Sequence, residues 1–118
     1  MDGISTYQDS AIGTQNKGRL IVMLYDGAIR FLKLAIMEME KNNYETKGRY
    51  INKALDIINE LNVVLDMDTG GEIAINLRQL YNFMNRRLSE ANVKCDPEMV
   101  RDIIKLLEEL NRGWKAIV

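Results

Sequence analysis

The residues that could carry chemistry are one cysteine and a few pairs of acidic residues. Cys95 is the only cysteine among the 118 residues, and the chain has no histidine. A thiol nucleophile usually depends on histidine as its base, so Cys95 is not expected to act in catalysis. A single cysteine also cannot form an intramolecular disulfide, which fits a reducing compartment.

The acidic pairs are better explained by helix ends and solvated faces than by catalysis. Asp66 and Asp68 fall where a predicted helix ends, and Glu108 and Glu109 fall on a charged helix face. Metal sites in helical bundles typically use Glu-x-x-His pairs, which this sequence cannot form. Glycine-rich phosphate-binding motifs are also missing. We therefore expect no enzymatic activity, no cofactor and no metal site.

Charge and hydropathy argue against two further kinds of partner. The net charge is -1, and no basic face dominates, so nucleic acid is not an expected partner. The most apolar stretch, residues 20–37, contains Asp26, Arg30 and Lys33, so membrane insertion is not expected. Residues 1–14 are polar and do not resemble an export signal. These features predict a cytoplasmic protein.

The spacing of apolar residues predicts an all-α protein with one domain. Three- and four-residue steps predict helices over about 16–41, 44–66, 71–93 and 97–116. Asp96 followed by Pro97 is a strong signal for a helix start. The connections are short, which favours antiparallel neighbours. The sequence therefore predicts an antiparallel four-helix bundle over residues 16–118, preceded by a short N-terminal arm at residues 1–15.

The turn between the second and third helices is specified at several positions. Gly70 and Gly71 tolerate backbone angles that other residues resist. Thr69 and Glu72 have the spacing of a capping box, so we expect Thr69 to cap the third helix. Together they predict an αα-hairpin.

The first two helices have more apolar surface than one packed face requires. One explanation is that the first helix lies centrally and is buried on several sides; the other is that part of the surplus forms a docking groove. The second and third helices offer the best groove candidates, with one tyrosine from the first helix. Each candidate could instead belong to the core. The candidates are Tyr25, Ile57, Leu61, Val64, Leu65, Leu77 and Tyr81.

Short segments, in order along the chain, resemble the FliS family of flagellar secretion chaperones. They are residues 4–7 (ISTY), 20–28 (LIVMLYDGA), 54–61 (ALDIINEL), 65–66 (LD), 70–77 (GGEIAINL), 80–81 (LY), 86–88 (RRL) and 91–92 (AN), followed by Trp114. The chain departs from the family pattern before the first helix, where Asn16, Lys17 and Gly18 replace the usual Ser-Pro-Glu.

The resemblance implies a chaperone that binds newly made flagellin in the cytoplasm. Its client would be the flagellin C-terminal segment, which is disordered when free, and binding would prevent premature polymerisation. The chaperone would then help deliver flagellin to the flagellar type III export apparatus. We expect a monomer that binds its client 1:1 through helix-in-groove contacts. The alternative is an assembly protein that pairs with its own copy through the apolar stripe.

The N-terminal arm carries apolar residues on an otherwise polar segment. Ile4 and Tyr7 could cover the groove while no client is bound, or could grip the client directly. Both residues are therefore candidates for partner binding. We favour the covering role, because it would limit self-association of the empty site.

Overall fold

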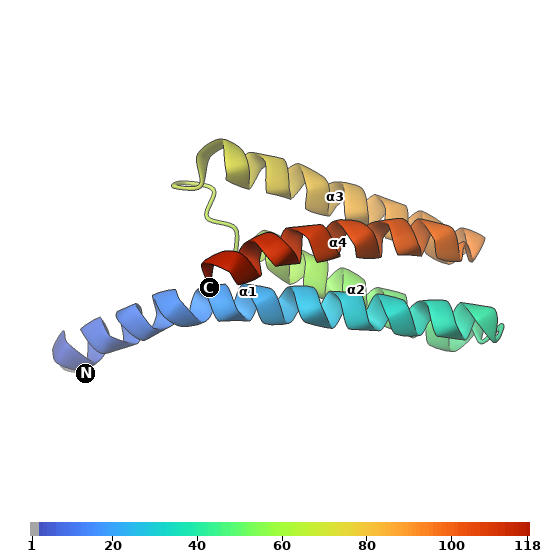
Figure 1. The fold of residues 1–118 in the computed structure, drawn as a ribbon, viewed down its shortest axis with the longest axis horizontal. Coiled ribbons are helices and arrows are strands. Elements are labelled where there is room, and N and C mark those ends of the chain that lie inside the picture. Colours follow the sequence, from blue (N-terminus) through green and yellow to red (C-terminus); the bar gives the residue numbers. More distant parts are fainter. Residues whose placement is uncertain (1–2) are drawn as a thin grey trace.

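The computed structural model describes the backbone of residues 3–118 and the side chains of residues 17–118. Over this range the chain forms four helices and no strand: α1 (Gly3–Glu40), α2 (Tyr44–Val63), α3 (Gly71–Lys94) and α4 (Pro97–Ile117). Successive helices run in opposite directions (Figure 1). The predicted all-α antiparallel four-helix bundle is therefore confirmed.

The first helix begins earlier than predicted. α1 starts at Gly3 rather than near residue 16, and its N-terminal part extends past the end of α4 (Figure 1). Extending an existing helix is much easier than nucleating a new one, so neither Gly18 nor the missing proline interrupts it. The side chains of Ile4 and Tyr7 lie outside the described residues, and a separate role for residues 1–15 remains a prediction.

The four helices pack in a ring around one core. α1 and α3 each pack against both α2 and α4. Every helix contributes fully buried side chains at helical spacing, which is what a single bundle core requires. The largest of them are Tyr25, Leu32, Ile51, Ile58, Leu61, Tyr81, Met84, Leu88, Val100, Ile103 and Leu107.

One predicted helix cap is confirmed and another is wrong. The Asp96 carboxylate accepts hydrogen bonds from the backbone N–H groups of Glu98, at 3.0 Å, and Met99, at 3.4 Å. Thr69, by contrast, does not cap α3: the N-cap position is Gly70, no side chain caps the helix, and the Thr69 hydroxyl donates to the Asp66 carboxylate. The turn before α3 is thus organised by Asp66, which also accepts from the Thr69 backbone N–H.

Two of the seams between helices are polar on their outer side. Three ion pairs bridge α1 and α4: Asp26–Lys115 at 3.3 Å, Lys33–Glu108 at 3.6 Å and Glu40–Arg101 at 3.0 Å. Two asparagine pairs bridge α2 and α3: Asn62–Asn82 at 3.2 Å and Asn59–Asn85 at 3.0 Å. The outer sides of these two seams are therefore not apolar surfaces.

The far end of the α2–α3 seam is closed by a buried lysine. The Lys47 Nζ donates to the Asn92 carbonyl oxygen at 2.5 Å and to the Asn92 side-chain oxygen at 2.6 Å. A cation at this place also complements the negative C-terminal end of α3. None of the helices, over the range that the structure describes, is long and apolar enough to span a membrane.

Candidate binding grooves

An apolar groove opens at the end of the bundle where α2 leads into α3. Its cavity volume is about 290 Å³, and all four helices contribute to it. We call it the inner groove. Its walls are Ile21, Leu61, Val64, Leu65, Ile73, Ala74, Leu77, Tyr81 and Trp114, and Lys17, Gly18, Asp66 and Gly70 complete the lining.

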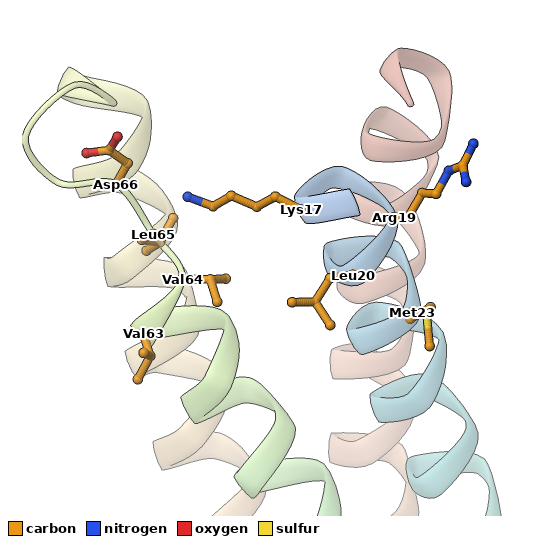
Figure 2. Close-up of a pocket in the computed structure, with 8 residues that line it drawn as sticks. All are labelled: Lys17, Arg19, Leu20, Met23, Val63, Val64, Leu65 and Asp66. Atoms are coloured by element: carbon orange, nitrogen blue, oxygen red, sulfur yellow. The ribbon is translucent and has the colours of Figure 1, made fainter. Parts of the chain in front are cut away.

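A second, larger opening adjoins the first between α1 and the end of α2 (Figure 2). Its cavity volume is about 910 Å³, and we call it the outer groove. Leu20 and Val64 face each other across it, whereas Arg19 points away. Its lining is Lys17, Arg19, Leu20, Met23, Val63, Val64, Leu65 and Asp66. Since Val64 and Leu65 line both grooves, they form the ridge between them.

The structure brings together five of the candidate residues named from the sequence. Leu61, Val64, Leu65, Leu77 and Tyr81 all line the inner groove. Leu61, Leu77 and Tyr81 are buried and form its floor, whereas Val64 and Leu65 are half-buried at its rim. These residues were expected to belong either to the core or to a docking groove. The floor residues belong to both, because they are buried and also line the groove.

Two other candidates lie outside the inner groove. Tyr25 is fully buried, and its hydroxyl lies 2.5 Å from the Tyr81 hydroxyl. Ile57 is half-buried farther along the α1–α2 seam, where a Cβ added to Gly27 would lie 3.2 Å from the Ile57 Cδ1. The Ile4 and Tyr7 side chains fall outside the described residues.

The two buried tyrosines join helices that lie diagonally across the bundle. Their rings are 6.4 Å apart, centroid to centroid, and tilted by 55°. Burial raises the pKa of the Tyr25 phenol, partly offset by hydrogen bonds with Tyr81 and Trp114. Burial, together with the bond to Tyr25, also raises the pKa of Tyr81. Both phenols are thus neutral at physiological pH, and their shared hydrogen bond satisfies polar atoms beneath an apolar groove.

The mouth of the grooves carries opposite charges. Lys17 extends from α1 toward the loop that contains Asp66 (Figure 2). Hydrogen bonds from the Thr69 hydroxyl and backbone N–H hold the pKa of the Asp66 carboxyl below its usual value, with a smaller contribution from Lys17. Asp66 is therefore an ionised turn residue at the rim, as its position at a helix end suggested.

Sequence reasoning missed part of the lining. Trp114 and Ile73 line the inner groove, although neither was among the groove candidates named from the sequence. Leu20 and Met23 line the outer groove and were not among those candidates either. Only the packing of four helices reveals which side of such a stripe stays open.

The remaining chemical candidates are not assembled into a site. Cys95 is half-buried just after α3, in a left-handed conformation with φ 51°, and lies beside the Asp96 cap. Among residues whose side chains are described, no three of the types Cys, Asp and Glu gather closely enough to hold a metal ion.

Comparison with known proteins places this chain among flagellar proteins. The model of the family described as flagellar protein FliS matches residues 1–118. A flagellar secretion chaperone FliS from Vibrio cholerae serotype O1 is 39% identical over 109 residues, which cover 92% of this chain and 80% of the relative.

Two further relatives agree over nearly the whole chain. The flagellar secretion chaperone FliS of Salmonella typhimurium is 38% identical over 120 residues, covering 98% of this chain and 89% of the relative. The one from Bacillus subtilis is 32% identical over 114 residues, covering 97% and 84%. The resemblance noted in the sequence is confirmed, and the chain belongs to the FliS family of flagellar proteins.

Proposed function

We propose that the protein is a flagellar secretion chaperone that binds flagellin in the cytoplasm. Its relatives carry the name of a chaperone and not of an enzyme, in agreement with the expectation that the chain catalyses no reaction. The client segment is the flagellin C-terminus, which is disordered when free. Its capture prevents premature polymerisation, and the complex is delivered to the flagellar export apparatus.

The observation that carries the proposal is the pair of adjoining apolar grooves. Large exposed apolar patches on small soluble proteins mark interaction sites. Val63 and Ile73 are each 73% exposed beside the shared ridge, and Met23 is 68% exposed on the outer groove. Apolar side chains at such exposure gain stability by contact with a partner.

The polar seams indicate where a client can run. The α1–α4 seam is bridged by ion pairs and the outer α2–α3 seam by asparagines, so neither favours an apolar segment. The grooves, joined at Val64 and Leu65, offer a continuous apolar path around the end of the bundle. A disordered client loses much conformational entropy on binding, so it must bury a large area along such a path. Short client helices lying in the grooves meet that need.

Co-purification with flagellin tests the proposal. Full-length flagellin should bind the chaperone, and flagellin without its C-terminal segment should not. Equal capture of both forms would show that the client segment is wrong, and capture of neither would overturn the function itself.

A further inference from the structure

Beyond the grooves, the α1–α2 seam carries a cluster of two aromatic rings and two cations. The rings of Phe31 and Tyr50 stack across the seam, with centroids 6.1 Å apart and planes 25° apart. The Arg30 guanidinium lies 5.4 Å from the centre of the Phe31 ring, and the Lys53 Nζ lies 5.3 Å from it. One ring, contributed by α1, thus holds a cation from each helix.

Neither cation has a carboxylate within ion-pair distance among the described side chains. None of the ion pairs formed among the side chains of residues 17–118 includes Arg30 or Lys53. Asp26, one turn before Arg30, is turned instead toward α4, where Asn111 donates to it at 2.7 Å and Lys115 lies at 3.3 Å. Both positive charges lie close to one ring, and a carboxylate brought near them would be attracted to each.

The cluster lies farther along the α1–α2 seam from the outer groove. The half-buried residues Leu24 and Ile57 lie on the same pair of helices, between the groove and Phe31. Phe31 comes eleven positions after Leu20, which lies at the groove. At the rise of an α-helix, this spacing corresponds to about 16 Å along α1. A client helix lying on this seam therefore meets apolar contacts first and two positive charges about three turns later.

We infer that Arg30 and Lys53 form a docking site for an acidic side chain of the flagellin client. The inference rests on the proposed function, and it adds the chemistry of the bound segment. An apolar side chain of the client fills the outer groove between Leu20 and Val64. A glutamate or aspartate about eleven residues from it lies between the two cations, provided that the segment is helical.

Neutral variants of the two cations test the site. Arg30→Gln and Lys53→Gln keep most of each side chain and remove its charge. Each should weaken binding of full-length flagellin about three-fold, and the double variant about ten-fold, with the loss shrinking as salt is raised. Arg86→Gln and Lys105→Gln are matched controls, since both are exposed cations on α3 and α4, and neither should change the affinity.

Three outcomes separate this site from the proposed function. If the parent protein fails to bind flagellin, the function is wrong. If it binds flagellin but the Arg30 and Lys53 variants bind as tightly as the parent, the acidic docking site is overturned. A fall in melting temperature without loss of affinity also overturns it, because the cations then serve only to stabilise the aromatic pair.

A client-side substitution completes the test. Acidic residues in the C-terminal segment of full-length flagellin are replaced one at a time by the matching amide. One of them should weaken binding to the parent about as much as to the Arg86→Gln control, but have no further effect on the double variant. The absence of any such coupled residue contradicts the inference.

Discussion

At the scale of single residues, the rim and the floor of the inner groove differ in burial, and so in how well they tolerate substitution. Val64 is half-buried at the ridge between the grooves, whereas Leu61 and Tyr81 are almost fully buried beneath it. We therefore expect substitutions at the rim to change client binding alone, and those at the floor to change the stability of the bundle as well.

We expect Val64→Asp to weaken flagellin binding by at least ten-fold while the protein stays folded. A carboxylate at the ridge would be desolvated without a partner when an apolar client covers it. Isothermal titration calorimetry measures the affinity, and circular dichroism checks the fold. Val93→Asp is the control, because Val93 is 88% exposed near the opposite end of α3 and lines neither groove. If a folded Val64→Asp protein binds as well as the parent, the groove is misplaced.

The buried tyrosine pair predicts both a non-additive effect of mutation and a dependence on pH. Tyr25→Phe leaves the Tyr81 hydroxyl buried without its partner and should cost about 1–3 kcal/mol of stability. Tyr25→Phe with Tyr81→Phe should cost less than the sum of the single changes. Urea unfolding measures both, and strictly additive losses would contradict a coupled pair.

The sign of the pH effect follows from the raised pKa values of the two phenols. The stabilisation is fully present below the unfolded pKa of tyrosine, about 10. Above that pH the unfolded chain loses phenol protons that the folded chain keeps, so the free energy of unfolding falls. The double phenylalanine variant should therefore show a shallower fall than the parent as the pH rises above about 10.

At the scale of elements, three of the helix ends are held by different side-chain interactions. α4 begins with a side-chain cap, the turn before α3 is organised by Asp66, and α3 ends with the Lys47 bonds to Asn92. Asp96, Lys47 and Asn92 line neither groove, so their loss should affect stability more than client binding. Asp66 differs from them, because it also lines both grooves.

Asp96→Ala should lower the free energy of unfolding by about 1 kcal/mol, the usual effect of losing an N-cap. The carboxylate accepts from two backbone N–H groups that have no other partner within the helix. Thermal unfolding measures the change, with Asp68→Ala as the control, because Asp68 is exposed in the loop. An equal effect of both substitutions would argue against the cap as the cause.

The N-terminal segment is the second element with a testable role. We propose that Ile4 and Tyr7 cover the grooves when no client is bound. Since α1 is continuous from Gly3, this lid requires the helix to unwind, for which Gly13 and Gly18 are the natural places. A variant lacking residues 1–15 should then bind flagellin up to about ten-fold more tightly, because burial of an aromatic residue is offset in part by ordering. Weaker binding in calorimetry would assign the segment to gripping the client instead.

At the scale of the whole molecule, the chain is elongated, 55 × 29 × 23 Å, and both grooves lie toward one end. An open apolar site serves either a client or a second copy of the same chain. The family supports the client, because its members are named as secretion chaperones. Self-association through the grooves is the competing use.

We expect a monomer at all concentrations, and one chaperone per flagellin in the complex. Size-exclusion chromatography with light scattering measures both masses. A dimer that grows with concentration, and that Val64→Asp abolishes, would favour the self-associating alternative. A matched run of Val93→Asp shows whether any change is specific to the groove.

The sequence alone determined the number of helices, their antiparallel order, the Asp96 cap and the family. These features depend on local spacing and on residues close together in the chain, so periodicity and capping rules can predict them. The Thr69 cap was wrong because α3 begins at Gly71, one residue later than a cap by Thr69 requires, so Gly70 takes the N-cap position.

Only the tertiary structure decided which apolar residues are floor, rim or exposed wall. The sequence named Leu61, Val64, Leu65, Leu77 and Tyr81 together, yet it could not separate them, nor find Trp114, Leu20 and Met23. Each helix has one broad apolar stripe, and the partner helices determine which part of it they cover. The exposure of a side chain therefore depends on how the four helices pack, and it cannot be read from the apolar stripe of one helix.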